Sequence, residues 1–87
     1  MVKAIVFPNP SKDAVNVTFE SNENRHIKIE IYSITGVLIQ TLLDDEIISF
    51  RNCTTIFNKN GELASGLYLC KISFGEQYIV KRIILSE

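Results

Sequence analysis

Alternation of apolar and polar residues constrains this chain more than any other feature of its sequence. The alternating apolar positions are Val15, Val17, Phe19, Ile27, Ile29, Ile31, Tyr68, Cys70 and Ile72. Successive side chains of a β-strand point to opposite faces, so alternation of this kind gives each strand one apolar face. We therefore expect a core built from β-strands, with the nine residues above largely buried.

Turn-forming residues divide the chain between these segments. The breaks include Pro8-Asn9-Pro10-Ser11, Ser33-Ile34-Thr35-Gly36, Asp44-Asp45-Glu46 and Gly75-Glu76. Glycine reaches positive φ at little cost, and Asn and Asp hydrogen-bond to nearby backbone. The predicted strands are 2–7, 14–20, 26–33, 37–43, 46–57, 66–74 and 77–85, the fifth with a possible break near Asn52. About seven short strands with regular turns predict an all-β antiparallel sandwich.

Length and charge limit the classes of function. A chain of 87 residues corresponds to one domain, which we assign to 1–87. Hydrophobic residues make up 46% of the chain, which is enough for one compact core. The net charge of −1 gives no general attraction to phosphate backbones, so nucleic acid is not an expected partner.

No constellation of residues predicts catalysis. His26 is the single histidine, and it falls at the expected start of a strand, where a solvated side chain is the ordinary outcome. The acidic run 44–46 lacks the alternating oxygen ligands and the glycine of a calcium loop. There is no glycine-rich phosphate loop either. We therefore expect no catalytic residue, metal, cofactor or small-molecule substrate.

The two cysteines, Cys53 and Cys70, lie outside any CxxC or Cys/His cluster, which argues against a zinc site. They can be two small core residues or the two halves of a disulfide. We expect free thiols, because neither has an obvious partner position.

Three blocks of sequence carry a family resemblance when they are taken together. The first, 7–17, opens with an aromatic residue and Pro8-Asn9-Pro10. The second, 29–39, has an Ile-Tyr pair followed by Gly36. The third, 63–72, contains Gly66 and Tyr68, and a basic pair, Lys81-Arg82, follows it. In order and spacing these blocks resemble the C-terminal (type A) sorting domain of cargo proteins of the type IX (Por) secretion system of Bacteroidetes.

The resemblance implies a fold, a function and partners. Members of this family are immunoglobulin-like sandwiches at the C-terminus of secreted proteins. The implied function is an address label that directs the parent protein from the periplasm across the outer membrane, for surface attachment or release. The implied partners are the outer-membrane translocon and a sortase-like surface peptidase. The alternative reading is a structural or adhesive immunoglobulin-like module of a surface or flagellar-cap-type protein.

The motif residues also have structural roles that the residues themselves favour. Pro8 and Pro10 are expected to hold the chain extended. Asp13 is expected to accept backbone N–H bonds in the turn before the second strand. Gly36 provides the freedom that a tight hairpin needs.

The C-terminal motif residues have expected roles as well. Gly66 lets the chain turn into a strand, and Tyr68 packs its ring in the core while its hydroxyl finds a partner. We expect 66–85 to carry the recognition surface, with Lys81 and Arg82 supplying charge. Unpaired edge strands also allow strand addition, to a translocon partner or to a second copy of the chain.

The start of the chain is too short and too soon broken by proline for a signal peptide. Because the predicted strands fill the chain from end to end, we expect one domain cut from a longer secreted protein.

Overall fold

A computed structural model describes residues 2–21, 24–47, 51–58 and 60–86, with the backbone alone described at 2, 47 and 51–53. The strands are β1 (Val2–Phe7), β2 (Val15–Ser21), β3 (Arg25–Ser33), β4 (Leu38–Ile47), β5 (Arg51–Phe57), β6 (Gly66–Phe74) and β7 (Gln77–Leu85). Six of the seven predicted strands agree with these bounds to within a few residues.

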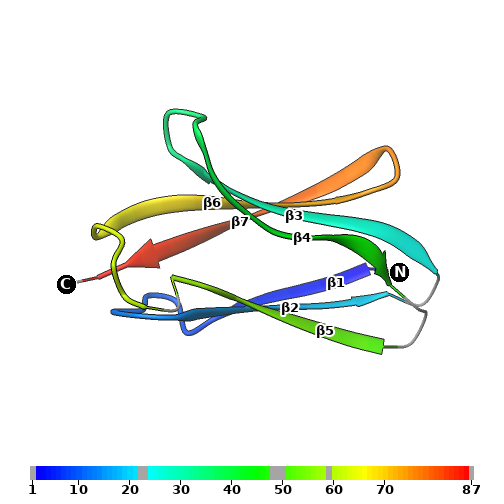
Figure 1. The fold of residues 1–87 in the computed structure, drawn as a ribbon, viewed down its shortest axis with the longest axis horizontal. Helices are drawn as coiled ribbons and strands as arrows, with labels where there is room; N and C mark the ends of the chain where they lie inside the picture. The colour runs from blue at the N-terminus through cyan, green and yellow to red at the C-terminus, as the bar shows by residue number, and fades with distance from the viewer. Residues whose placement is uncertain (1, 22–23, 48–50, 59, 87) are drawn as a thin grey trace.

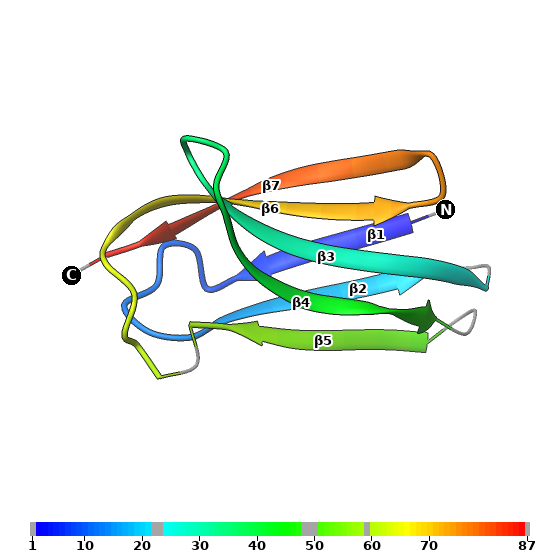
Figure 2. The ribbon, with the colours of Figure 1, turned by 45° about the horizontal axis from the view of Figure 1, so that its top comes forward.

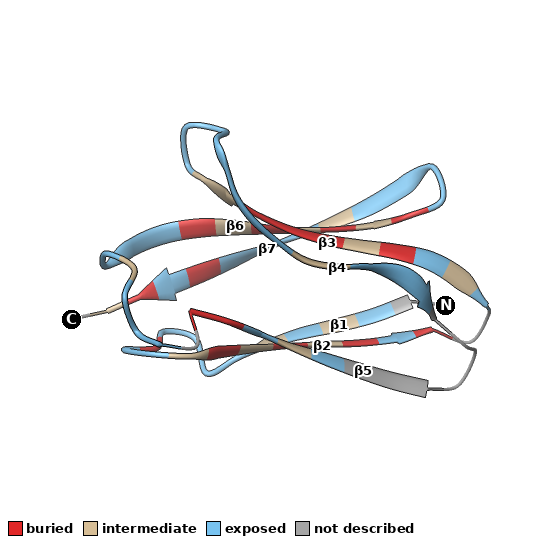
Figure 3. Ribbon diagram, in the orientation of Figure 1, coloured by how far each residue is buried: buried red, intermediate tan, exposed pale blue. Residues whose placement is uncertain are grey.

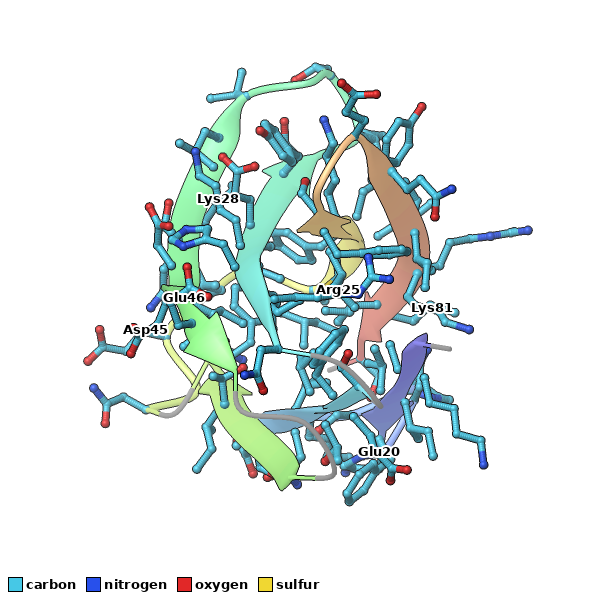
Figure 4. The ribbon with its side chains drawn as sticks, turned by 90° about the vertical axis from the view of Figure 1, so that its right-hand side faces the viewer. Glu20, Arg25, Lys28, Asp45, Glu46 and Lys81 are labelled. Atoms are coloured by element: carbon cyan, nitrogen blue, oxygen red, sulfur yellow. The ribbon has the colours of Figure 1, made fainter. Side chains whose placement is uncertain are left out.

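The seven strands form two antiparallel sheets that face each other (Figures 1 and 2). One sheet has the order β1-β2-β5, and the other has the order β4-β3-β6-β7. The arrangement confirms the predicted all-β sandwich. It leaves β1 and β7 at one side of the molecule and β4 and β5 at the other, as the view along the strands shows (Figure 4).

The acidic run 44–46 corrects the sequence prediction, because it continues β4 and does not form a break. The predicted strand 46–57 is consequently split, and its second part is β5. The physical reason is the pairing of β4 with β3, which places Asp44 opposite Lys28 and Glu46 opposite His26. Oppositely charged or hydrogen-bonding residues across a ladder stabilise strand pairing, so polar side chains do not end the strand here.

The core lies between the sheets, where the alternating residues of both layers meet (Figure 3). All nine residues predicted to be buried are buried, including Val17, Phe19 and Ile29, which have no exposed surface. Phe57, Phe74, Ile83 and Leu85 complete the core. Phe57 packs edge-on against the Tyr68 ring, with the ring centroids 5.6 Å apart.

Tyr68 joins the start of β6 to the segment before it. Its ring is buried, and its hydroxyl donates a 2.7 Å hydrogen bond to the carbonyl oxygen of Ala64, four residues upstream. A tyrosine at this place in an immunoglobulin-like sandwich, bonded to the backbone just upstream, forms the tyrosine corner. The expectation that the Tyr68 hydroxyl finds a partner is confirmed.

The described residues form no helix that could cross a membrane.

Candidate recognition surface along the last strand

The basic pair lies on β7, an edge strand of the four-stranded sheet. Lys81 pairs with Cys70 and Arg82 pairs with Leu69 across the regular β6–β7 ladder. Because Cys70 is buried in the core, Lys81 stands on the inner face of the sheet and Arg82 on the outer face. Both side chains are exposed, so the two cations flank the strand edge from opposite sides instead of sharing one face.

Lys81 lies on the side of the molecule opposite the acidic residues of β4. Lys81 lies between β7 and β1, whereas Asp45 and Glu46 project from β4 at the opposite side (Figure 4). Within the described part of the chain, Lys81 and Arg82 form no ion pair. Their charges are therefore open to an anionic group from outside the domain.

Asn9 fastens the segment after β1 to β7. Its Nδ2 donates a 2.7 Å hydrogen bond to the carbonyl oxygen of Arg82, and its Oδ1 accepts a 2.9 Å bond from the N–H of Ile84. The amide side chain thus occupies the place of a neighbouring strand's peptide group. It brings the first motif block against the last one, 73 residues away along the chain.

Ser11 continues this contact with its backbone. The Ser11 N–H donates to the carbonyl oxygen of Ile84 at 2.9 Å, and the Ser86 N–H donates to the carbonyl oxygen of Ser11 at 2.7 Å. Ser11 and Leu85 form a parallel bridge. The C-terminal half of the β7 edge is therefore covered by residues 9–11.

The prolines around Asn9 act differently from the sequence prediction. The chain bends at 8–10 after β1 ends at Phe7, instead of remaining extended. Both Phe7-Pro8 and Asn9-Pro10 are cis peptide bonds. In this bent conformation Asn9 and Ser11 form their hydrogen bonds with the edge of β7.

A groove of about 400 Å³ separates β1 from β7 beside this contact. Lys81 and Arg82 line it together with Asn9, and the opposite wall comes from β1, at Ala4, Ile5 and Val6. A second hollow, of about 300 Å³, lies on the other side of the molecule, is lined in part by Ile39, Ile56 and Leu63, and involves neither Asn9 nor the basic pair.

The remaining motif residues shape turns. Gly36 adopts φ +88° in the β3–β4 hairpin, and its N–H donates a 3.0 Å bond to the carbonyl oxygen of Ser33, which confirms the hairpin prediction. Gly66 has φ +147° at the start of β6. L-residues rarely adopt either value, which explains glycine at both positions.

Asp13 binds through its backbone. Its N–H donates to Ser11 Oγ at 3.3 Å, and its carbonyl oxygen accepts a 3.0 Å bond from Asn58 Nδ2. Its carboxylate lies close to Gly61, where a Cβ would come within 2.8 Å of Oδ1. We expected backbone N–H groups to donate to the Asp13 carboxylate. Among the described residues no such hydrogen bond is present.

Away from β7, His26 meets the carboxylates of Asp44 and Glu46 at the exposed surface of the β3–β4 pair. His26 is exposed, and its hydrogen bond to Asp44 raises its pKa above the ordinary value, with Glu46 contributing. Burial raises the pKa of the Cys70 thiol to about 12. The described residues contain no group of three His, Cys, Asp or Glu side chains placed to hold a metal ion.

The cysteine prediction is confirmed in its described part, since Cys70 is a buried free thiol. The side chain of Cys53 lies outside the described residues.

The contact of Asn9 with β7 is the arrangement at this surface that sequence reasoning missed. The Pro-Asn-Pro motif marked the segment, but no local signal indicated that an amide would meet a strand more than 70 residues away. The opposite orientation of the basic pair could have been found, because adjacent residues on a strand must face opposite ways.

Comparison with known proteins assigns the family. None of the curated proteins matches the chain. The model of the secretion system C-terminal sorting domain matches residues 5–86, which is nearly the whole length. This family comprises signals of type IX secretion that mark proteins for export to the cell surface or for secretion, and it is not known as enzymatic. The chain belongs to this family and is a C-terminal sorting signal for type IX secretion.

Proposed function

We propose that the type IX machinery reads this domain at its last two strands, residues 66–85, and that Lys81 and Arg82 are the charged contacts. One observation carries the proposal: two exposed cations flank an edge strand and form no ion pair in the described part of the chain. Exposed charges contribute more to the rate and selectivity of encounter than to tight affinity. That balance suits a signal that is bound, passed on and released.

Gly66 and Tyr68 support this surface from within. Tyr68 is buried, so its contribution is to hold the start of β6 through the bond to Ala64. Gly66 provides the backbone conformation with which β6 begins, opposite Leu85 at the end of β7. Both are therefore positioning residues for the recognition strands.

The domain acts in this proposal as a substrate of the machinery and not as a catalyst. Residues 1–87 form one sorting unit of a longer secreted protein, whose export the unit directs. The partners are the outer-membrane translocon, which reads the folded unit, and a sortase-like surface peptidase, which removes it. No observation favours the alternative of a structural or adhesive module.

The test attaches the domain, with its natural linker, to an exported reporter in a bacterium that has the type IX system. Lys81 and Arg82 are replaced together by Gln, which removes both charges and retains most of the side-chain length. We expect delivery of the reporter to the surface to fall at least fivefold. Circular dichroism must show that the variant melts near the temperature of the unmodified domain.

Two results would contradict the proposal in different ways. Delivery of the folded double variant at the unmodified rate would remove the basic pair from the signal. Failure of the unmodified domain to deliver the reporter would contradict its action as a sorting signal for this system. A matched control is Lys12→Gln, which removes an exposed cation from the segment between β1 and β2, outside residues 66–85.

A further inference from the structure

The edge of β7 is only half covered. The carbonyl oxygen of Arg82 and both backbone groups of Ile84 bond to residues 9–11, so the even-numbered residues of β7 direct their backbone groups away from β6. The β6–β7 ladder has no register shift, so the same holds for Tyr78 and Val80. No strand or loop of the described chain pairs with these two residues on that side.

The open stretch therefore consists of the N–H and C=O groups of Tyr78 and Val80 and the N–H of Arg82. It is regular, in contrast to the edge strand β4, whose pairing is interrupted by two register shifts. Irregularities of that kind protect an edge from pairing with another chain. The first half of β7 has no such protection.

The side chains around this stretch leave it accessible. Tyr78 is 62% exposed and Val80 47% exposed, both on the outer face of the sheet. Lys71 of β6 places its Nζ 4.8 Å from the centroid of the Tyr78 ring. This cation–π contact holds the ring over β6, and thus away from the edge.

The charges beside the open stretch are matched to an added strand. The side chains of an added strand alternate, so one of two adjacent residues faces the groove at Lys81 and the next faces the outer side at Arg82. Two neighbouring carboxylates on an incoming segment would therefore each meet one cation. Cations on opposite faces of β7 therefore match acidic residues that are adjacent in the added segment. Two cations on one face would instead match acidic residues two positions apart.

We propose that the open half of the β7 edge binds an extended segment of a partner protein by strand addition, and that this segment carries two adjacent acidic residues. Main-chain bonds to Tyr78, Val80 and Arg82 hold the segment, and Lys81 and Arg82 select its charge. Asn9 limits how far the added segment can pair along β7, because Asn9 already occupies the edge from the Arg82 carbonyl onward. The inference rests on the proposed function and specifies how the machinery reads the last strand.

A second copy of the domain fits this edge less well. Its β7, Gln77–Leu85, contains no Asp or Glu, so a copy paired along this edge would bring two further cations and no carboxylate to Lys81 and Arg82. An acidic partner segment is favoured by that same charge.

Val80→Pro tests the main-chain part of the proposal. The Val80 N–H points away from β6, so proline at this position removes an edge donor without removing a bond of the β6–β7 ladder. Val80→Thr is the matched control, because it keeps the N–H and the β-branched shape. In the reporter assay we expect Val80→Pro to lower surface delivery at least tenfold and Val80→Thr to leave it within twofold.

Arg82→Glu tests the charge of the partner and does not depend on how proline is tolerated. We expect delivery to fall at least fivefold further with Arg82→Glu than with Arg82→Gln, because the reversed charge repels an acidic segment. Equal delivery by the two Arg82 variants would overturn the acidic partner. Unmodified delivery by folded Val80→Pro would overturn strand addition, while a loss in the Lys81/Arg82→Gln variant would still support the recognition surface.

Sedimentation velocity of the isolated chain tests whether a second copy of the domain occupies the open edge of β7. We expect the unmodified chain and Val80→Pro to sediment as monomers at tens of micromolar. A dimer formed by the unmodified chain and abolished by Val80→Pro would identify a second copy as the occupant and would overturn the partner proposed here.

Discussion

Ile29 lies at the middle of the core on β3, a strand that is paired on both sides, with β4 and with β6. Its side chain has no exposed surface and stands opposite Ile72, which is equally buried. In a sandwich of this size such a residue contributes packing that nearby side chains cannot replace, because interiors are close-packed. Its truncation therefore leaves a cavity.

We expect Ile29→Ala to lower the free energy of unfolding by about 2–5 kcal/mol, from lost burial and from the cavity. Urea denaturation followed by circular dichroism measures the change. Ile34→Ala is the control, since Ile34 is 65% exposed in the β3–β4 turn and its truncation should change stability by no more than about 0.5 kcal/mol. Similar small losses for both variants would contradict the assigned core.

Among the strand pairs, β3–β4 is held at its open end by a polar cluster. His26 of β3 contacts Asp44 and Glu46 of β4, and Lys28 Nζ lies 3.6 Å from Glu30 Oε2 along β3. The hydrogen bond to Asp44 is the main reason for the raised pKa of His26. Where the acidic run 44–46 predicted a turn, the structure has a continuous strand whose polar side chains pair with β3.

We expect His26 to titrate above 6.5 in the folded chain, and Asp44→Asn to bring its pKa down toward that value. Because the folded pKa is raised, the contribution of His26 to stability is fully present below about 6.5 and is lost as the pH rises through the folded value. Imidazole proton shifts measured by NMR against pH check both statements. A His26 pKa that Asp44→Asn leaves unchanged would exclude the hydrogen bond as its cause.

At the scale of the whole molecule, Asn9 connects the two sheets along one side of the sandwich. The segment that carries it follows β1 of the first sheet, and both of its side-chain bonds go to β7 of the second. The first and last motif blocks of the family therefore form one structural unit. The strand that we propose for recognition depends in this way on a residue near the other end of the chain.

We expect Asn9→Ala to destabilise the domain by roughly 1–3 kcal/mol, as two hydrogen bonds are lost. The Ile84 amide should also exchange its hydrogen faster, because its acceptor is removed. Thermal denaturation and NMR-detected hydrogen exchange measure the two effects. Asn60→Ala, in the exposed loop after β5, is the control and should change neither.

The sequence by itself determined six of the seven strands, nine side chains of the core and the place of the Gly36 hairpin turn. These follow from local properties, namely the period of two and the conformational freedom of glycine. The sequence also singled out the basic pair and the Pro-Asn-Pro motif. It did not indicate that the two lie side by side in the folded chain.

Only the tertiary structure decided how the candidate site is assembled. It paired Asp44 and Glu46 with β3, bent the chain at Pro8 and Pro10, and brought Asn9 to Arg82 and Ile84. Each of these depends on contacts between residues that are distant in sequence, and local preference alone does not select among the competing pairings. The open half of β7 has the same origin, since a strand's edge is defined by which other strands pair with it.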